Sequence, residues 1–218
     1  QKTRAQDELP QSAGGRTITT TEPKFIPQEA VELKLAGEVT IRVRLVDCVG
    51  FMVEGAAGHL EDGAERLVKT PWYDHEIPFT QAAELGTRKV ITDHSTIGVV
   101  VTTDGSFSDL PQETYLDAEN QAISELKKLH KPFLVLVNSS HPSSRTAREA
   151  AERIEKQHSV AAMPVNCAQL SEEDIRQIME QILYEFPVSR VEFYMPKWVE
   201  MLPFSHPLKT GLIEKIRE

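Results

Sequence analysis

The strongest constraint on the fold is a regular alternation of apolar and amphipathic segments over residues 96–186. Runs rich in apolar and β-branched residues predict three buried strands, Thr96–Thr103, Pro132–Val137 and Val160–Val165. Amphipathic stretches between and after them predict three helices, Ala118–Leu129, Arg145–Lys156 and the segment from Ser171, a favourable N-cap, to about Phe186. This alternation predicts an α/β fold with a mostly parallel sheet and helices on both faces.

A hairpin and another helix are predicted before this region. Val31–Leu35 and Val39–Val46 alternate between apolar and polar residues across a short glycine-containing turn, which is typical of an antiparallel hairpin. The second run becomes apolar at Leu45, so we expect it to enter a covered core. A helix is predicted over Thr80–Asp93.

The remaining segments predict loops and a domain boundary. Residues 1–29 and 51–78 are rich in polar residues, glycine and proline, and we expect both to be irregular. We therefore expect one domain over residues 1–186 and the beginning of a second module over residues 187–218. In the second module the sequence predicts a strand over Val188–Met195 and a short helix over Leu208–Arg217.

Composition excludes several classes of protein. The formal net charge of −9 leaves no basic excess to neutralise nucleic-acid phosphates, so nucleic-acid binding is not expected. No apolar run approaches the roughly 20 residues that cross a bilayer, and the polar N-terminal segment does not resemble a signal peptide. Cys48 and Cys167 lie far apart in apolar surroundings, which predicts reduced core thiols in a cytosolic protein.

Polar residues follow the predicted strands, and one pair points to nucleotide chemistry. Asp47 ends the strand in IRVRLVDCVG, and Gly50 follows three positions later. A strand-Asp-x-x-Gly arrangement is how P-loop nucleotidases place an acid beside Mg²⁺ and a glycine amide beside the terminal phosphate. Asp47 would hold the metal through water and Gly50 would donate to the γ-phosphate. A plain turn is the alternative, because Asp and Gly are common after any strand.

Two further strand ends would surround the nucleotide base. Asn138-Ser139-Ser140-His141 occupies the position at which guanine-binding loops carry Asn-Lys-x-Asp, but both the Lys and the Asp are missing. A guanine N–H pair would meet no carboxylate, which makes adenine plausible. Asn166 and Cys167 begin the loop that would support the base through backbone amides, and a strand-end turn is the alternative.

A threonine cluster lies upstream of the hairpin, in the segment TITTT. Thr20 or Thr21 would ligate Mg²⁺ and sense the γ-phosphate, as a switch-loop hydroxyl does. The alternative is a hydroxyl-rich loop that caps itself. Consecutive Asp93, His94 and Ser95 cannot converge as a catalytic triad, and the seven histidines show no zinc-ligand spacing with the cysteines.

The phosphate-binding motif itself is missing, since no GxxxxGK[ST] occurs in these residues. In P-loop folds this motif follows a central strand, which would lie between the strand that ends at Asp47 and the one that ends near Thr103. We therefore expect the native polypeptide to extend upstream of Gln1. Without that strand and its lysine, the chain would have a gap in its sheet and would lack catalytic competence.

Four segments carry a resemblance to a known family: RAQDELPQSAGGRTITTTEPKFIP, IRVRLVDCVG, TPWYDHEIPFTQAAELGTRKVI and HSTIGVVVTTDGS. They closely resemble the stage IV sporulation protein A family of endospore-forming bacteria. The resemblance implies a mother-cell cytoplasmic ATPase, related to the translation-factor class of GTPases, that polymerises into the basement layer of the spore coat on the outer forespore membrane. It assigns the Walker B aspartate to Asp47 and the threonines needed for hydrolysis to Thr20 and Thr21.

The resemblance also implies partners. These are further copies of the chain, a small membrane-anchoring spore-coat peptide and other coat proteins, the last two bound through regions outside these residues. Membrane association would then be indirect. We therefore predict a Mg²⁺-dependent ATPase that drives self-assembly. The alternatives are a GTP-binding regulatory switch and a non-catalytic scaffold with a nucleotidase-like fold.

Overall fold

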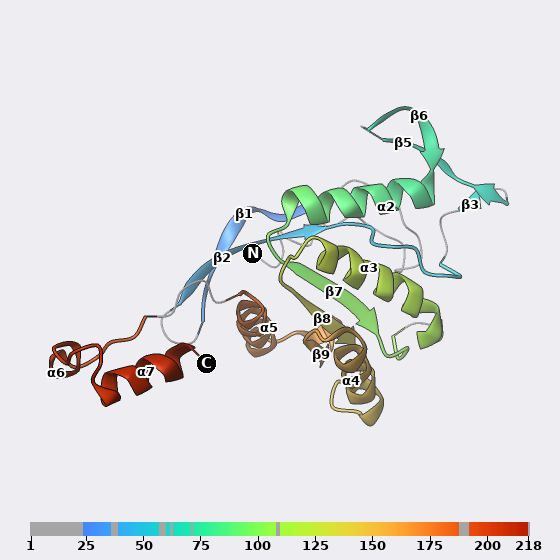
Figure 1. The fold of residues 1–218 in the computed structure, drawn as a ribbon. Coiled ribbons are helices and arrows are strands. Elements are labelled where there is room, and N and C mark those ends of the chain that lie inside the picture. Colours follow the sequence, from blue (N-terminus) through green and yellow to red (C-terminus); the bar gives the residue numbers. More distant parts are fainter. Residues whose placement is uncertain are drawn as a thin grey trace. The chain divides into compact units, whose positions relative to one another are not determined.

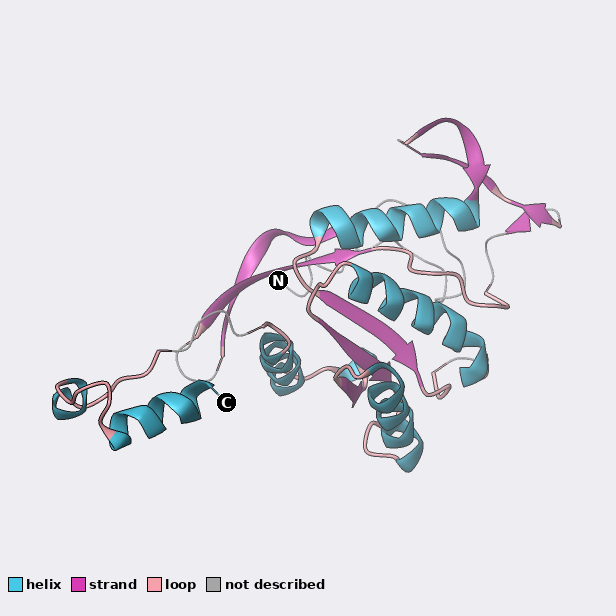
Figure 2. Ribbon diagram, in the orientation of Figure 1, coloured by secondary structure: helices cyan, strands magenta, loops and turns pink. Residues whose placement is uncertain are grey.

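The computed structural model describes residues 24–35, 39–56, 60–61, 63–70, 72–107, 110–187 and 192–217. The chain divides into two compact units, Gln1–Phe186 and Pro187–Glu218, and each is described by itself. The order of elements along the chain can be followed in Figure 1, and their types in Figure 2.

A three-stranded parallel sheet is the centre of the first unit. Its strands, in spatial order, are β7 (Gly98–Thr103), β8 (Phe133–Asn138) and β9 (Ala162–Val165). The helices that connect and follow these strands are α3 (Leu116–Lys128), α4 (Arg145–His158) and α5 (Glu172–Tyr184), with short 3₁₀ turns at Gln112–Tyr115 and Cys167–Gln169. Parallel strands need such crossovers. The predicted α/β fold and these three helices are confirmed.

Two apolar cores cover the two faces of this sheet. On one face Val135 of β8 packs with Ile123 of α3 and Ile154 of α4. On the other, Leu134 packs with Ile178 of α5. Successive residues of a strand point to opposite faces, so the continuous apolar run of β8 supplies both cores. Ser171 caps α5, as predicted, and the structure adds a capping box in which the Asp174 side chain accepts from the Ser171 backbone N–H.

Helix α2 (Phe79–Lys89) precedes β7 and continues as a π-helical turn over Val90–His94, which confirms the predicted helix. Its inward-facing residues recur at helical spacing: Phe79, Ala82, Ala83, Gly86, Thr87 and Val90 are all buried. The Arg88 guanidinium lies 3.7 Å from the Glu125 carboxylate of α3. Lys131 Nζ donates to the carbonyl oxygens of Thr92 and Ser95, where the helical segment ends.

The predicted hairpin is present and its first strand is longer than expected. β1 (Lys24–Lys34) pairs antiparallel with β2 (Thr40–Asp47), and Lys24 lies opposite Asp47. Residues 24–29 were predicted to be loop, and this expectation was wrong. The register shifts between Ile26 and Val31, a segment that contains Pro27. Proline removes a ladder hydrogen bond and breaks the alternation that marks a strand, so the sequence signal is lost there.

The region 51–78 was predicted to be irregular, and this was also wrong in part. It contains the short antiparallel pairs β3 (Leu60–Glu61) with β4 (Ala64–Glu65), and β5 (Leu67–Thr70) with β6 (Tyr73–Pro78). In Figure 1 the β5–β6 pair extends from the beginning of α2. Four consecutive residues of β6, from Tyr73 to Glu76, are exposed, so the alternating burial that marks a strand in sequence is absent.

One edge of the parallel sheet is open in the described part of the chain. No described strand pairs with the outer edge of β7 or with the second edge of β2. Val99 and Val101 of β7 are 41% and 59% exposed, and Leu45 of β2 is 56% exposed. The sequence predicted that β7 is a buried strand and that Leu45 enters a covered core. Both expectations were wrong for these three residues. Val100 on the opposite face of β7 is buried against the α3 core.

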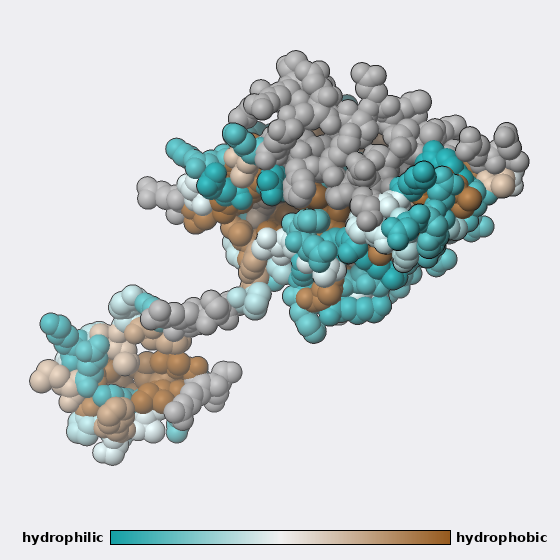
Figure 3. Space-filling model, turned by 90° about the horizontal axis from the view of Figure 1, so that it is seen from above, coloured by the Kyte–Doolittle hydropathy of each residue, from teal (hydrophilic) through white to brown (hydrophobic). Residues whose placement is uncertain are grey.

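The second unit contains two helices, α6 (Lys197–Glu200) and α7 (Pro207–Arg217), the latter close to the predicted helix. Lys209 is buried and its Nζ donates to the carbonyl oxygens of Glu200 and Leu202. Residues 192–196 form no strand, contrary to the prediction, and residues 188–191 lie outside the described part. Apolar side chains gather on the surface of this unit (Figure 3), including Met201 and Phe204, which are 85% and 80% exposed.

Candidate functional site

The loop after β2 carries the first predicted site residues. Asp47 is the last residue of β2 and its side chain is exposed. Gly50 follows with φ of +84°, a conformation that L side chains rarely adopt, and a Cβ built at this position meets no atom within 4 Å. Backbone conformation rather than crowding therefore favours glycine at this position.

Thr87 of α2 holds this loop. The Gly50 N–H donates to Thr87 Oγ1 at 3.0 Å, and the same hydroxyl donates to the Gly50 carbonyl oxygen at 3.1 Å. Cys48 is also within hydrogen-bonding reach of the Thr87 side chain, and burial raises the pKa of the Cys48 thiol. The thiol therefore stays protonated at neutral pH. Sequence reasoning missed Thr87, whose only signal is a hydroxyl on the apolar stripe of a predicted helix.

A cavity of about 450 Å³ joins this loop to the parallel sheet. It is lined by residues 46–51, by β7 and by the inner face of α3. A second cavity of about 690 Å³ is lined by residues 41–46 of β2, by residues 94–97 and Val99, and by apolar residues at the end of α5, among them Ile182. Val46 of β2 and Val99 of β7 line both cavities, which therefore lie between these two strands.

A buried ion pair supports the wall of the first cavity. Glu119 of α3 is 4% exposed and lies beside Arg153 of α4, with Nη1 and Oε1 2.9 Å apart. Thr102 Oγ1 of β7 donates to Glu119 Oε2 at 2.8 Å. A buried carboxylate needs such partners to offset desolvation. These contacts tie β7, α3 and α4 together beside the candidate site.

The ends of β8 and β9 are joined through their polar residues. The Cys167 N–H donates to Asn138 Oδ1 at 2.9 Å, and the Ser139 N–H donates to the Val165 carbonyl at 2.8 Å. Asn166 Nδ2 lies 3.5 Å from the Ser140 carbonyl oxygen, which it reaches as a donor. Four predicted site residues, Asn138, Ser139, Asn166 and Cys167, therefore form one cluster. Burial raises the pKa of the Cys167 thiol.

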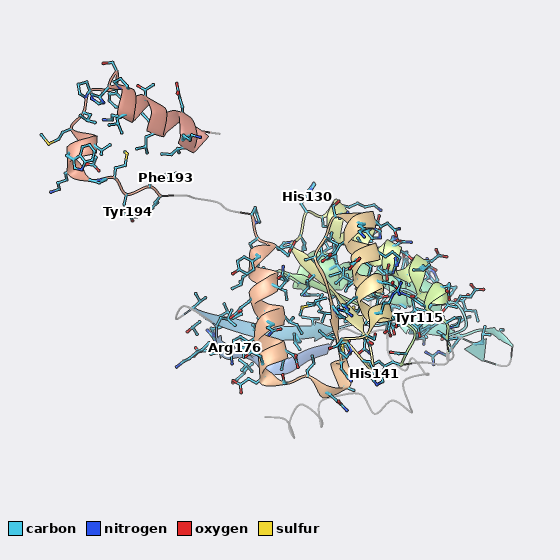
Figure 4. The ribbon with its side chains drawn as sticks, turned by 90° about the horizontal axis from the view of Figure 1, so that it is seen from below. Tyr115, His130, His141, Arg176, Phe193 and Tyr194 are labelled. Atoms are coloured by element: carbon cyan, nitrogen blue, oxygen red, sulfur yellow. The ribbon has the colours of Figure 1, made fainter. Side chains whose placement is uncertain are left out.

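The end of β7 joins the same cluster. The Asp104 N–H donates to the Asn138 carbonyl at 3.4 Å, and the Ser140 N–H donates to Ser106 Oγ at 2.9 Å. Partial burial acts to raise the pKa of Asp104, but hydrogen bonds from Ser106 and Ser139 outweigh it, so the pKa is lowered. In Figure 4, His141 after β8 and His130 before it mark opposite ends of the sheet, and Tyr115 lies toward the His141 end. Sequence reasoning missed Ser106, which lies in a turn with no motif of its own.

Among the described residues, Asp47 is the predicted ligand that could contribute to a magnesium site. Thr20 and Thr21 lie outside the described part of the chain. Among the described residues no group of three or more His, Cys, Asp or Glu is placed to hold a metal. Mg²⁺ in phosphoryl-transfer sites takes one or two carboxylates and completes its shell with water and substrate phosphates. The exposed oxygen ligands of Asp47 match that requirement.

No helix in the described part of the chain is long and apolar enough to span a membrane. No solved structure matches the chain.

Comparison with known proteins gives consistent matches. The chain is 46% identical over 217 residues to stage IV sporulation protein A of Clostridioides difficile (strain 630). It is 42% identical to the proteins of that name from Bacillus anthracis and Bacillus subtilis (strain 168), over 215 and 217 residues. These alignments cover 99–100% of the chain and 44% of each relative, so the chain spans less than half of their length. Residues 1–187 match the family described as "Stage IV sporulation protein A, ATPase domain", and the chain belongs to that family.

Proposed function

We propose that this domain binds and hydrolyses ATP at the carboxyl edge of its sheet, and that hydrolysis drives self-assembly. The observation that carries the proposal is the Asp47–Gly50 loop, which borders a cavity beside the open edge of a parallel sheet. Open α/β sheets bind ligands at the carboxyl ends of their strands. Membership of a family described as an ATPase domain supports the same chemistry.

The predicted phosphate-site and metal-site residues each have a role in this proposal. Asp47 would hold Mg²⁺ through water, and the Gly50 N–H would bind the γ-phosphate. Thr20 or Thr21 would place a hydroxyl on the metal and, together with Gly50, order the γ-phosphate. The metal, when bound, neutralises charge on the β- and γ-phosphates. Positioning and charge stabilisation do most of the work in phosphoryl transfer, so a dedicated general base is not required.

The cluster at the ends of β8 and β9 would hold the base. Asn138 Oδ1 positions the backbone of Cys167, so Asn138 and Ser139 order the loop that begins at Asn166. This loop would present backbone amides to the base. Where guanine-binding loops carry the carboxylate that reads the two guanine N–H groups, this chain has His141, which favours ATP over GTP.

The phosphate cradle would come from outside these residues. We propose that a strand and a phosphate-binding loop of the complete polypeptide occupy the space between β2 and β7. The unpaired strand edges and the exposed Val99, Val101 and Leu45 support this, as does the greater length of the relatives. On this proposal the present chain alone does not hydrolyse ATP.

At the level of the whole protein, we propose assembly into the basement layer of the spore coat, on the forespore surface in the mother cell. Further copies of the chain would be the first partners. A small membrane-anchoring peptide and other coat proteins would bind through other regions. The sporulation-protein names of the relatives support the setting.

Sedimentation of the complete polypeptide tests this function. We expect pelletable polymer with ATP and Mg²⁺, and little polymer without nucleotide or with Asp47→Ala. Equal polymer under all three conditions would instead favour a scaffold that uses the nucleotidase fold only for shape. The matched control is Asp93→Ala, which changes an exposed aspartate outside the site and should assemble normally.

A further inference from the structure

The Gly50 amide, which the proposed function assigns to the γ-phosphate, already has a partner in this structure. It donates to Thr87 Oγ1 at 3.0 Å, across 37 positions of sequence. The Thr87 hydroxyl in turn donates to the Gly50 carbonyl at 3.1 Å. Both backbone groups of Gly50 are therefore held by one side chain of α2.

Thr87 is well placed to act on this loop. It is 4% exposed and belongs to the inward stripe of α2, four residues after Ala83, which is also buried. A hydroxyl has one donor hydrogen and two acceptor lone pairs, so it can serve both groups of Gly50 at once. Packing fixes the helix, and the hydroxyl connects the helix to the loop.

One N–H cannot donate fully to two acceptors on different sides. For the γ-phosphate to bind the Gly50 amide, this amide must leave Thr87. A hydrogen bond to an ionised phosphate is roughly twice as strong as one between neutral groups, so the exchange is favourable when the γ-phosphate is present. ADP has no γ-phosphate and leaves the Thr87 bond intact.

We propose that Thr87 is a positioning residue that holds Gly50 in the resting state and competes with the γ-phosphate for its amide. The release of Thr87 would report the presence of ATP to α2. This proposal rests on the proposed function, because it requires a γ-phosphate at Gly50. Stabilisation of the resting state lowers the affinity for ATP but leaves the affinity for ADP unchanged.

The test is the ratio of dissociation constants for ADP and for a non-hydrolysable ATP analogue, measured on the complete polypeptide with Mg²⁺. Thr87→Val removes the hydroxyl at nearly constant shape. We expect it to raise the ratio Kd(ADP)/Kd(ATP analogue) about fivefold, the equivalent of one ordinary hydrogen bond lost from the resting state. Thr87→Ser keeps the hydroxyl and should retain the wild-type ratio.

Two more variants keep the test decisive. Thr87→Ala also removes the hydroxyl and has higher helix propensity, so it should reproduce the change if the valine variant does not fold. Thr80→Ala removes a hydroxyl from the first turn of the same helix, where Thr80 Oγ1 bonds Glu65, and should leave the ratio unchanged.

The outcomes separate this inference from the proposed function. If Thr87 had only a structural role, its loss would change the affinities for ADP and for the ATP analogue by the same factor. An unchanged ratio Kd(ADP)/Kd(ATP analogue) in both Thr87→Val and Thr87→Ala would therefore overturn the inference, although the protein would still bind ATP. A wild-type protein that binds neither nucleotide would overturn the proposed function and the inference together.

Discussion

At the scale of single residues, hydrogen bonds hold the loops at the strand ends in place, and many of these bonds join residues that are far apart in the sequence. Sequence patterns reveal such bonds only in part. The positions of Asp47, Asn138 and Asn166 at the ends of strands could be predicted, because each of these polar residues follows an apolar run. Thr87 and Ser106 could not, because their partners lie 37 and 34 positions away and no periodicity marks such contacts. A hydroxyl on a buried stripe is a weak signal until its partner is seen.

The lowered pKa of Asp104 gives a prediction for pH dependence. Because this pKa is lower in the folded state, the carboxylate stabilises the fold above its ordinary pKa of 3.8. That contribution is lost as the pH falls through the folded-state pKa. In urea unfolding of the chain, Asp104→Asn should therefore lose less stability than wild type between about pH 5 and 3.

Asp93→Asn provides the control for this pH prediction, at an exposed site outside the network. Its stability should follow the wild-type pH profile. An Asp104→Asn profile that is parallel to wild type would show that the hydrogen bonds from Ser106 and Ser139 do not stabilise the ionised form.

At the scale of elements, prediction succeeded where one face of an element is buried. Helices α3, α4 and α5 lie close to their predicted positions because their apolar residues recur every three to four positions. β5 and β6 could not be predicted, because most of their side chains face solvent and only backbone pairing defines them. The start of β1 was missed because Pro27 interrupts the alternation.

A substitution of Gly98, at the beginning of β7, tests how closely α3 packs on the sheet. A Cβ at this position would lie 2.6 Å from Leu126 Cδ2 and 3.1 Å from Phe133 Cβ. Gly98→Ala should reduce the free energy of unfolding by about 1–3 kcal/mol through overpacking. The measurement is urea unfolding monitored by circular dichroism.

Gly211→Ala is the opposite case and serves as control. Gly211 lies inside α7 and a Cβ there meets nothing within 4 Å. Higher helix propensity should stabilise α7 by about 0.5–1 kcal/mol. Equal effects of the two substitutions would contradict the close packing of Gly98 against α3.

At the scale of the whole molecule, the main question is what covers the open edge of the sheet beside β7 in the complete polypeptide. A P-loop arrangement predicts a strand between β2 and β7, and the described residues place two cavities there instead of a paired strand. Sequence patterns could predict the parallel sheet, but they could not show that Val99, Val101 and Leu45 are exposed in this chain. Their exposure depends on what packs against them, which lies beyond local pattern.

Val101→Glu tests whether this edge is covered in the complete polypeptide. An exposed substitution normally changes stability by less than about 0.5 kcal/mol. If a further part of the complete polypeptide covers β7, the charge becomes buried, and we expect a loss of about 2 kcal/mol or more in the free energy of unfolding. Leu67→Glu, at a similarly exposed apolar residue of β5, is the matched control and should have little effect. A small effect of both in denaturant titrations would mean that β7 stays uncovered.

The most direct test of the central claim is phosphate release from ATP and from GTP, measured side by side on the complete polypeptide with Mg²⁺. We predict faster release from ATP, lost in Asp47→Ala and retained in Asp93→Ala. Faster release from GTP would contradict the base preference inferred from Asn138–His141. Near-normal ATP hydrolysis by Asp47→Ala would contradict the placement of the active site at the end of β2.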